Sequence, residues 1–208
     1  MPESQDIGAE SDIESNAARQ RRLQRQADFT GGRLETFRDV LLRHGLPGLL
    51  VAVGLILHPA MPDLALRSLA GLREDPVSYL TWGVVILALL TLFSWWRART
   101  WQPVQILWIL YLGALSVWEE WVFRLGLPYL LNSHGTDLVA AIVLSNVAFG
   151  LMHYFTLRWK WYWCVAACLG GMGLSRVMGA HFDLLLVAGL HWVGTFLNTP
   201  RMPGLATR

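Results

Sequence analysis

The stretch VQILWILYLGALSVWEEWVFRLGLPYL, residues 104–130, decides the fold. It is apolar over more than the roughly 20 residues that an α-helix needs to cross a bilayer. It nevertheless contains two adjacent carboxylates and one guanidinium, those of Glu119, Glu120 and Arg124. Ionisable groups inside a span are costly and are functional candidates by default. The stretch therefore predicts both a transmembrane helix and a buried polar centre.

The composition of the whole chain agrees with a membrane environment. Of 208 residues, 54% are hydrophobic and 15% are charged, against about 25% charged in a soluble domain. Residues 1–45 hold 7 of the 17 Lys and Arg and 8 of the 15 Asp and Glu, which leaves about one charge per ten residues beyond them. This density argues against a soluble enzyme, a nucleic-acid binder and a disordered protein. Cys164 and Cys168 lie in an apolar stretch and give no disulfide framework.

Five further apolar runs accompany residues 104–130. They cover residues 46–62, 77–97, 137–157, 160–179 and 182–199. We therefore expect an all-α fold, a polytopic transmembrane helix bundle of about six spans within residues 46–199.

The two ends of the chain are polar. Residues 1–33 have no apolar periodicity and predict a disordered arm, whose basic run RQRRLQRQ is either solvated or in contact with lipid headgroups. Residues 34–45 place apolar side chains on one face and predict a short interfacial amphipathic helix. Residues 200–208 are the expected C-terminal tail.

The distribution of Lys and Arg predicts the orientation. With six spans and the N-terminus inside, the inner segments hold 13 of these residues and the outer segments hold 4. Because cytoplasmic loops are enriched in Lys and Arg, both termini should be cytoplasmic. We expect an integral membrane protein of a bacterial plasma (inner) membrane.

Two histidines lie in other predicted spans. His153 is in NVAFGLMHYF and His191 is in AGLHWVGTFLN. Residues four or seven positions apart share a helix face. The neighbours on these faces are Phe149 and Asn146 for His153, and Thr195 and Asn198 for His191. Brought together, one carboxylate and two imidazoles can hold a water or a metal ion, and they supply the base and the donors that hydrolysis needs.

The three motifs resemble the type II CAAX prenyl endopeptidase and bacteriocin-processing (CPBP) family of intramembrane proteases. The order is EEWVFR from Glu119 to Arg124, then FGLMH from Phe149 to His153, then a third helix with His191. The resemblance covers roughly residues 104–198, the motif-bearing core. The third motif departs from the family pattern, which has Asn where this chain has Thr195.

The resemblance implies an enzyme, a peptide hydrolase that cleaves a membrane-anchored protein or peptide. Glu119 would activate water with His153 and His191 as partners. Glu120 and Arg124 would orient the site, and Thr195 or Asn198 would assist the oxyanion. Phe149 and Asn146 would shape the pocket. We favour a metal-free, glutamic mechanism, because no pair of ligands has HExxH spacing. The alternative is a metalloprotease with Zn²⁺ bound by Glu119, His153 and His191.

Two other interpretations use the same residues. A non-catalytic family member could bind peptides without cutting them, and a small proton-coupled transporter could use the Glu and His side chains as a relay, although the chain shows no paired repeats.

The three proposed catalytic residues are predicted to lie at different depths in the membrane. On straight antiparallel helices, His153 lies about 10 Å from the level of Glu119 and His191. The protease interpretation therefore requires that Glu119, His153 and His191 converge.

Overall fold

The computed structural model describes residues 23, 34, 36–98 and 102–204, and the elements within these ranges are helices. Among the described residues, five helices are long and apolar enough to cross a bilayer, and a sixth apolar helix is shorter. The predicted all-α membrane bundle is confirmed, and the chain is an integral membrane protein. The arm, residues 1–33, lies outside the described residues except for Leu23.

The long helices follow one another with short connections. The first runs without a break through α2 (Phe37–Val40), the π-helical turn η1 (Leu41–Gly45) and α3 (Leu46–Ile56). Two short helices, α4 (Met61–Ser68) and α5 (Ala70–Glu74), lead to α6 (Pro76–Ala98). The central helix comprises α7 (Val104–Glu120), the π-helical turn η2 (Trp121–Gly126) and α8 (Leu127–Ser133). The last three are α9 (Leu138–Thr156), α10 (Trp161–His181) and α11 (Leu184–Asn198).

The first helix differs from the sequence expectation at both ends. Residues 37–45 continue into α3 instead of forming a separate interfacial helix, and the helix stops at Ile56 instead of residue 62. A capping box sets its start, since the hydroxyl of Thr36 accepts from the N–H of Asp39 and the carboxylate of Asp39 accepts from the N–H of Thr36. Pro59 explains the earlier end, because it disfavours a helical conformation at the preceding residue.

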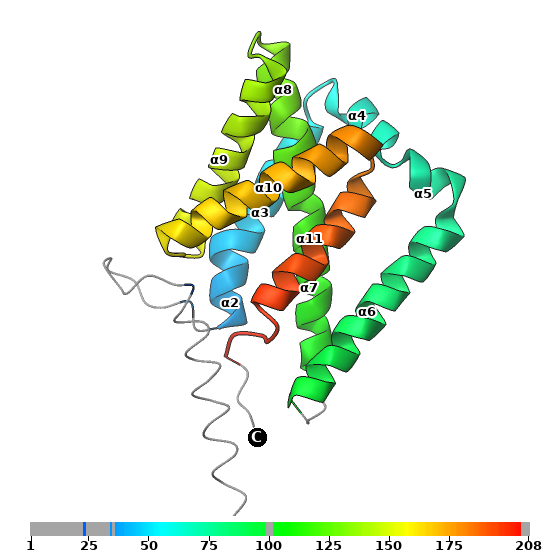
Figure 1. The fold of residues 1–208 in the computed structure, drawn as a ribbon, viewed down its shortest axis with the longest axis vertical. Helices are drawn as coiled ribbons and strands as arrows, with labels where there is room; N and C mark the ends of the chain where they lie inside the picture. The colour runs from blue at the N-terminus through cyan, green and yellow to red at the C-terminus, as the bar shows by residue number, and fades with distance from the viewer. Residues whose placement is uncertain (1–22, 24–33, 35, 99–101, 205–208) are drawn as a thin grey trace, which may run out of the picture.

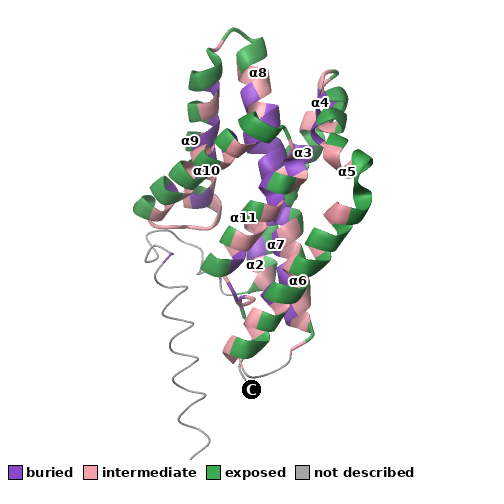
Figure 2. Ribbon diagram, turned by 45° about the vertical axis from the view of Figure 1, so that its right-hand side comes forward, coloured by how far each residue is buried: buried purple, intermediate pink, exposed green. Residues whose placement is uncertain are grey.

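The central helix runs through the middle of the molecule, and α10 crosses obliquely in front of it (Figure 1). Figure 2 shows that burial concentrates along the central helix, whereas α6 at the flank is mostly exposed or half-buried. Two apolar clusters contain residues of the central helix. One includes Trp108, Ile109 and Leu112, and the other includes Trp121 and Val122. The carboxylates at 119 and 120 therefore lie between the two clusters in the chain.

Candidate active site

The two adjacent carboxylates of the central helix are buried, and each has a partner of its own besides His191, which lies near both. Glu120 places Oε2 3.1 Å from Nε of Arg124 and Oε1 2.7 Å from Nδ1 of His191. Glu119 places Oε1 2.8 Å from Nε2 of His44 and Oε2 3.7 Å from Nε2 of His191. Three helices thus contribute to one polar cluster, and His191 on α11 contacts both carboxylates.

The hydrogen-bond partners of the imidazoles fix where their protons lie. Nδ1 of His153 is 2.8 Å from the carbonyl oxygen of Phe149, which can only accept, so Nδ1 is the protonated nitrogen. Nδ1 of His191 faces a carboxylate that is already paired with Arg124, so it also donates. In the neutral form of each ring, Nε2 is then a lone pair available to a water or a metal ion.

Two prolines explain why the chain widens into π-helical turns beside this cluster. The sequence Gly-Leu-Pro occurs at 45–47 and again at 126–128. In both places its glycine is the last residue of the π-helical turn, η1 or η2. Proline has no N–H and crowds the carbonyl four residues before it, which disrupts the regular helical ladder. π-Helical turns of this kind are frequent at functional sites.

In η2, a serine compensates for the missing hydrogen bond. The N–H of Leu127 donates to the carbonyl of Val122, which is the i to i+5 pattern. By the same pattern the carbonyl of Phe123 would pair with residue 128, a proline. The hydroxyl of Ser145 on α9 donates to this carbonyl instead, at 2.6 Å. The widened turn that contains Arg124 is thereby joined to the helix that contains His153.

Phe149 is the aromatic contact of the cluster. Its ring centroid lies 4.3 Å from the guanidinium carbon of Arg124, 4.5 Å from the ring of His153 and 5.7 Å from the ring of His191. It therefore packs against both histidines and also makes a cation–π contact with Arg124. Asn146, the second residue expected to shape the pocket, is not among the cavity-lining residues. It is buried against α10, with Nδ2 donating to the hydroxyl of Ser175 at 2.9 Å.

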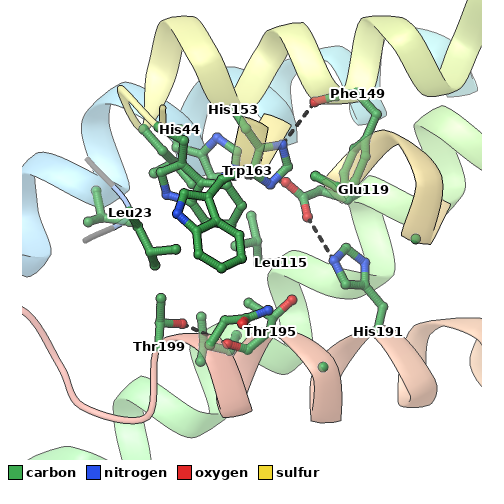
Figure 3. A pocket seen from close by; sticks show the side chains of 18 of the residues that line it. Leu23, His44, Leu115, Glu119, Phe149, His153, Trp163, His191, Thr195 and Thr199 are labelled. Atoms are coloured by element: carbon green, nitrogen blue, oxygen red, sulfur yellow. Dashed lines mark hydrogen bonds and ion pairs between the residues drawn. The ribbon is translucent and has the colours of Figure 1, made fainter. Parts of the chain in front are cut away.

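A cavity of about 650 Å³ opens beside the cluster. Its wall includes Glu119, His153 and His191, with apolar side chains such as Leu112 and Trp163 around them. In Figure 3, Thr195 lies across the cavity from Glu119 and His153. Asn198 also lines the cavity, one turn further along α11. The carbonyl of Leu23 accepts from the N–H of Lys160, and Leu23 lines the cavity as well.

The candidate metal ligands differ from the predicted set. Among the described residues, the group whose ligand atoms lie within 4.8 Å of one another is His44, Glu119 and His153. The predicted third ligand, His191, is not in this group, and its Nδ1 pairs with Glu120. His44 takes its place from the first helix.

The structure thus brings Glu119, His153 and His191 together, and the depth mismatch that straight helices imply is absent. Sequence reasoning missed His44, because residues 34–45 were assigned to an interfacial helix. A signal for it exists in the sequence: His44 is seven residues after Phe37 and four after Val40, on the apolar face of that segment.

Comparison with known proteins gives a family match for the segment that contains Glu119, His153 and His191. Residues 100–197, just under half of the chain, match the family described as type II CAAX prenyl endopeptidase Rce1-like. Neither a curated protein nor a solved structure matches the chain. The resemblance predicted from the motifs is therefore confirmed for this segment. It supports peptide hydrolysis as the general activity.

Proposed function

From the premise that residues 100–197 form an Rce1-like domain, we propose that the chain is an intramembrane endopeptidase that cleaves a membrane-associated protein or peptide. One observation supports this most directly. Oε2 of Glu119 and Nε2 of His191, from two different helices, face each other at 3.7 Å beside the cavity. That separation is too long for a direct hydrogen bond, and one water on the cavity side can contact both atoms.

In the proposed reaction, a water that contacts both atoms from the cavity is the nucleophile. Oε2 of Glu119 takes a proton from the water, and the water oxygen bonds to the peptide carbonyl carbon. The π electron pair of the C=O bond moves to the carbonyl oxygen, which becomes the oxyanion. The C–N bond then breaks as the carboxyl of Glu119 returns the proton to the leaving nitrogen. The products are a carboxylic acid and an amine, and Glu119 is ionised again.

The second carboxylate would orient the histidine that shares the water. Glu120 is fixed by Arg124 and accepts from Nδ1 of His191. A buried carboxylate that accepts from a histidine holds the ring in one tautomer and orientation, as in serine protease triads. Glu120 and Arg124 therefore act through His191 in this proposal.

Thr195 and Asn198 are the proposed oxyanion donors. Both belong to α11 and line the cavity, and Thr195 lies across it from Glu119 (Figure 3). Donors aimed at the developing negative charge are a large contribution to such reactions. Thr195 supplies one hydroxyl where the family pattern has an amide, so Asn198 would provide the second donor.

The cavity suits an apolar segment of a polypeptide. Its volume is within the range of about 300–1,000 Å³ typical of ligand sites, and Leu112, Trp163 and Leu174 are among its apolar wall residues. The family description suggests a prenylated CAAX sequence as the first substrate class to test. We also propose that both termini are cytoplasmic in a bacterial plasma membrane, because the Lys and Arg bias favours this orientation.

A zinc-dependent version is the second candidate, and one observation favours it. The ligand atoms of His44, Glu119 and His153 lie within 4.8 Å of one another, and Nδ1 of each histidine is bonded to an oxygen of the protein, as is usual for zinc-ligating histidines. These residues therefore fit a zinc ion with an open fourth position. When bound, zinc would polarise the carbonyl and activate water.

The test uses purified full-length protein in proteoliposomes with internally quenched peptides, with and without a farnesylated CAAX end. We expect wild-type protein to cleave one of these classes and Glu119→Gln to lose about 10²–10⁴-fold in kcat while remaining folded. Glu74→Gln, an exposed carboxylate on α5, is the matched control and should keep full activity.

Each result bears on the proposal. Full activity of Glu119→Gln would overturn the mechanism. Peptide binding without cleavage by wild-type protein would favour the non-catalytic alternative, and substrate uptake without cleavage would favour a transporter. Loss of activity on chelation, with stoichiometric metal in the active protein, would select the zinc version over the glutamic one.

A further inference from the structure

His44 is a buried polar residue outside the matched segment that nevertheless contacts the central carboxylate. It lies in η1 of the first helix and is 1% exposed. Its Nε2 is 2.8 Å from Oε1 of Glu119, and its Nδ1 is 2.7 Å from the hydroxyl oxygen of Thr156. Both ring nitrogens therefore have a specific partner, on two other helices.

The proton on Thr156 determines the state of the ring. The hydroxyl of Thr156 donates its single proton to the carbonyl of Met152, at 2.6 Å. It can only accept from His44, so Nδ1 of His44 is protonated. At 2.8 Å, Nε2 of His44 and Oε1 of Glu119 are too close to face each other as two lone pairs, so one proton lies between them.

This contact leaves one oxygen of Glu119 for chemistry. Oε1 is engaged by His44, whereas Oε2 faces His191 across the gap of 3.7 Å. The ring of His44 also packs at 5.2 Å between centroids against that of His153, which fixes its plane (Figure 3). The rotation of the Glu119 carboxylate is thereby set by a residue of the first helix.

We propose that His44 is a positioning residue of the hydrolytic centre, which holds Oε1 of Glu119 so that Oε2 is presented to the water. The inference rests on the proposed function. His44 also lines the cavity, but both of its ring nitrogens are engaged by protein partners. It therefore acts through Glu119, and its loss should lower kcat and leave KM unchanged. The first helix is then part of the active centre rather than only a membrane anchor.

The experiment compares three replacements in the same proteoliposome assay. His44→Ala removes the contact and should lower kcat about 10²-fold, because a misplaced general base loses most of its effect. His44→Gln retains an N–H donor at similar reach and should recover activity to within about 10-fold of wild type. His134→Ala, in an exposed connection, is the matched control and should leave kcat unchanged.

A fourth variant tests the proton argument. Thr156→Val removes the acceptor for Nδ1 at nearly constant shape, so it should lower kcat by less than His44→Ala and should have no added effect in the double variant. Additive losses would contradict the path from Thr156 through His44 to Glu119.

The outcomes separate this inference from the proposed function. Wild-type kcat in His44→Ala, with Glu119→Gln inactive, would overturn the role of His44 alone. Equal losses of activity and of thermal stability in His44→Ala and His44→Gln would show a structural role and would also overturn it. Activity in Glu119→Gln would overturn the proposed function itself.

Discussion

The central helix, Val104–Ser133, and the peripheral segment, Met61–Ala98, are neighbours in sequence that differ in burial. In the peripheral segment the buried residues are mainly Met61, Leu64 and Ser68 of α4. The window of α6 that could span the membrane is more apolar than that of the central helix, yet Leu90 is the buried residue of α6. In α7 the buried residues include Glu119 and Glu120. Apolar composition therefore predicts that a helix lies in the membrane, and polar residues within the apolar run predict which helix lies at the centre.

The same contrast separates two ion pairs with identical spacing. Glu120 and Arg124 are i,i+4 and their side chains are 0% exposed, whereas Asp63 and Arg67 are i,i+4 with side chains 73% and 61% exposed. An exposed pair contributes about 0–1 kcal/mol. A buried pair is costly to break, because the remaining charge has no partner and no solvent.

The largest expected effect tests that difference directly. Arg124→Leu leaves the carboxylate of Glu120 buried without its cation, and should lower the free energy of unfolding by about 3–5 kcal/mol. It should also reduce activity, since Glu120 orients His191. The measurement is denaturant unfolding in detergent, followed by tryptophan fluorescence.

The matched control is Arg67→Leu in the peripheral segment, which should change the free energy of unfolding by at most about 1 kcal/mol. If the two replacements were equally costly, burial would not be what distinguishes the pairs, and the central position of Glu120 would contribute nothing to stability.

The contrast also explains how much of the site could be predicted from sequence. Glu119, His153 and His191 were found because each is an ionisable residue inside an apolar run, which is a local signal. Their convergence could not be predicted, since straight helices place His153 at a different depth. The partner of each nitrogen depends on packing among four helices, which is why His191 was assigned to the metal ligands and His44 was overlooked.

The fold could likewise be predicted where a local signal decides it, and not where packing or capping decides it. The ranges of α6, α9 and α10 agree within a few residues with the apolar runs, because hydropathy alone sets them. The first helix was misjudged at both ends, since its start depends on the capping pair of Thr36 and Asp39 and its length includes a π-helical turn. The repeated Gly-Leu-Pro at 45–47 and 126–128 is a sequence signal for both turns that periodicity does not detect.

A smaller effect, of opposite sign, comes from two single glycines, one on α10 that faces the central helix and one on α6 of the peripheral segment. At Gly171 of α10 a Cβ would lie 2.8 Å from Nη2 of Arg124 and would also meet Oδ1 of Asn146. Because Arg124 is held by Glu120, Gly171→Ala should destabilise the protein by about 1–3 kcal/mol. At Gly83 of α6 a Cβ would meet nothing within 4 Å, so Gly83→Ala should stabilise it by about 0.5–1 kcal/mol.

Thermal unfolding of both variants in the same detergent measures the difference. A stabilising Gly171→Ala would mean that Arg124 can move away freely, and the rigid packing of the central ion pair would be contradicted.

The smallest effect belongs to the start of α6 and depends on pH. Oδ1 of Asp75 accepts from the N–H of Ser78 at 3.1 Å, and the hydrogen bonds from the side chain and backbone of Ser78 lower the pKa of Asp75 from 3.8. A carboxyl whose pKa is depressed by folding stabilises the folded state above its unfolded value, and this contribution is lost as pH falls through the folded pKa. Asp75→Ala should therefore unfold at a lower temperature than wild type at about pH 7, and the difference should shrink as pH falls below the ordinary pKa of 3.8 and through the lowered folded pKa of Asp75. If the difference in unfolding temperature stayed constant over this range, the effect would come from helix propensity rather than from the charge of Asp75. The exposed carboxylate at the start of α6 would then not contribute to stability through its charge.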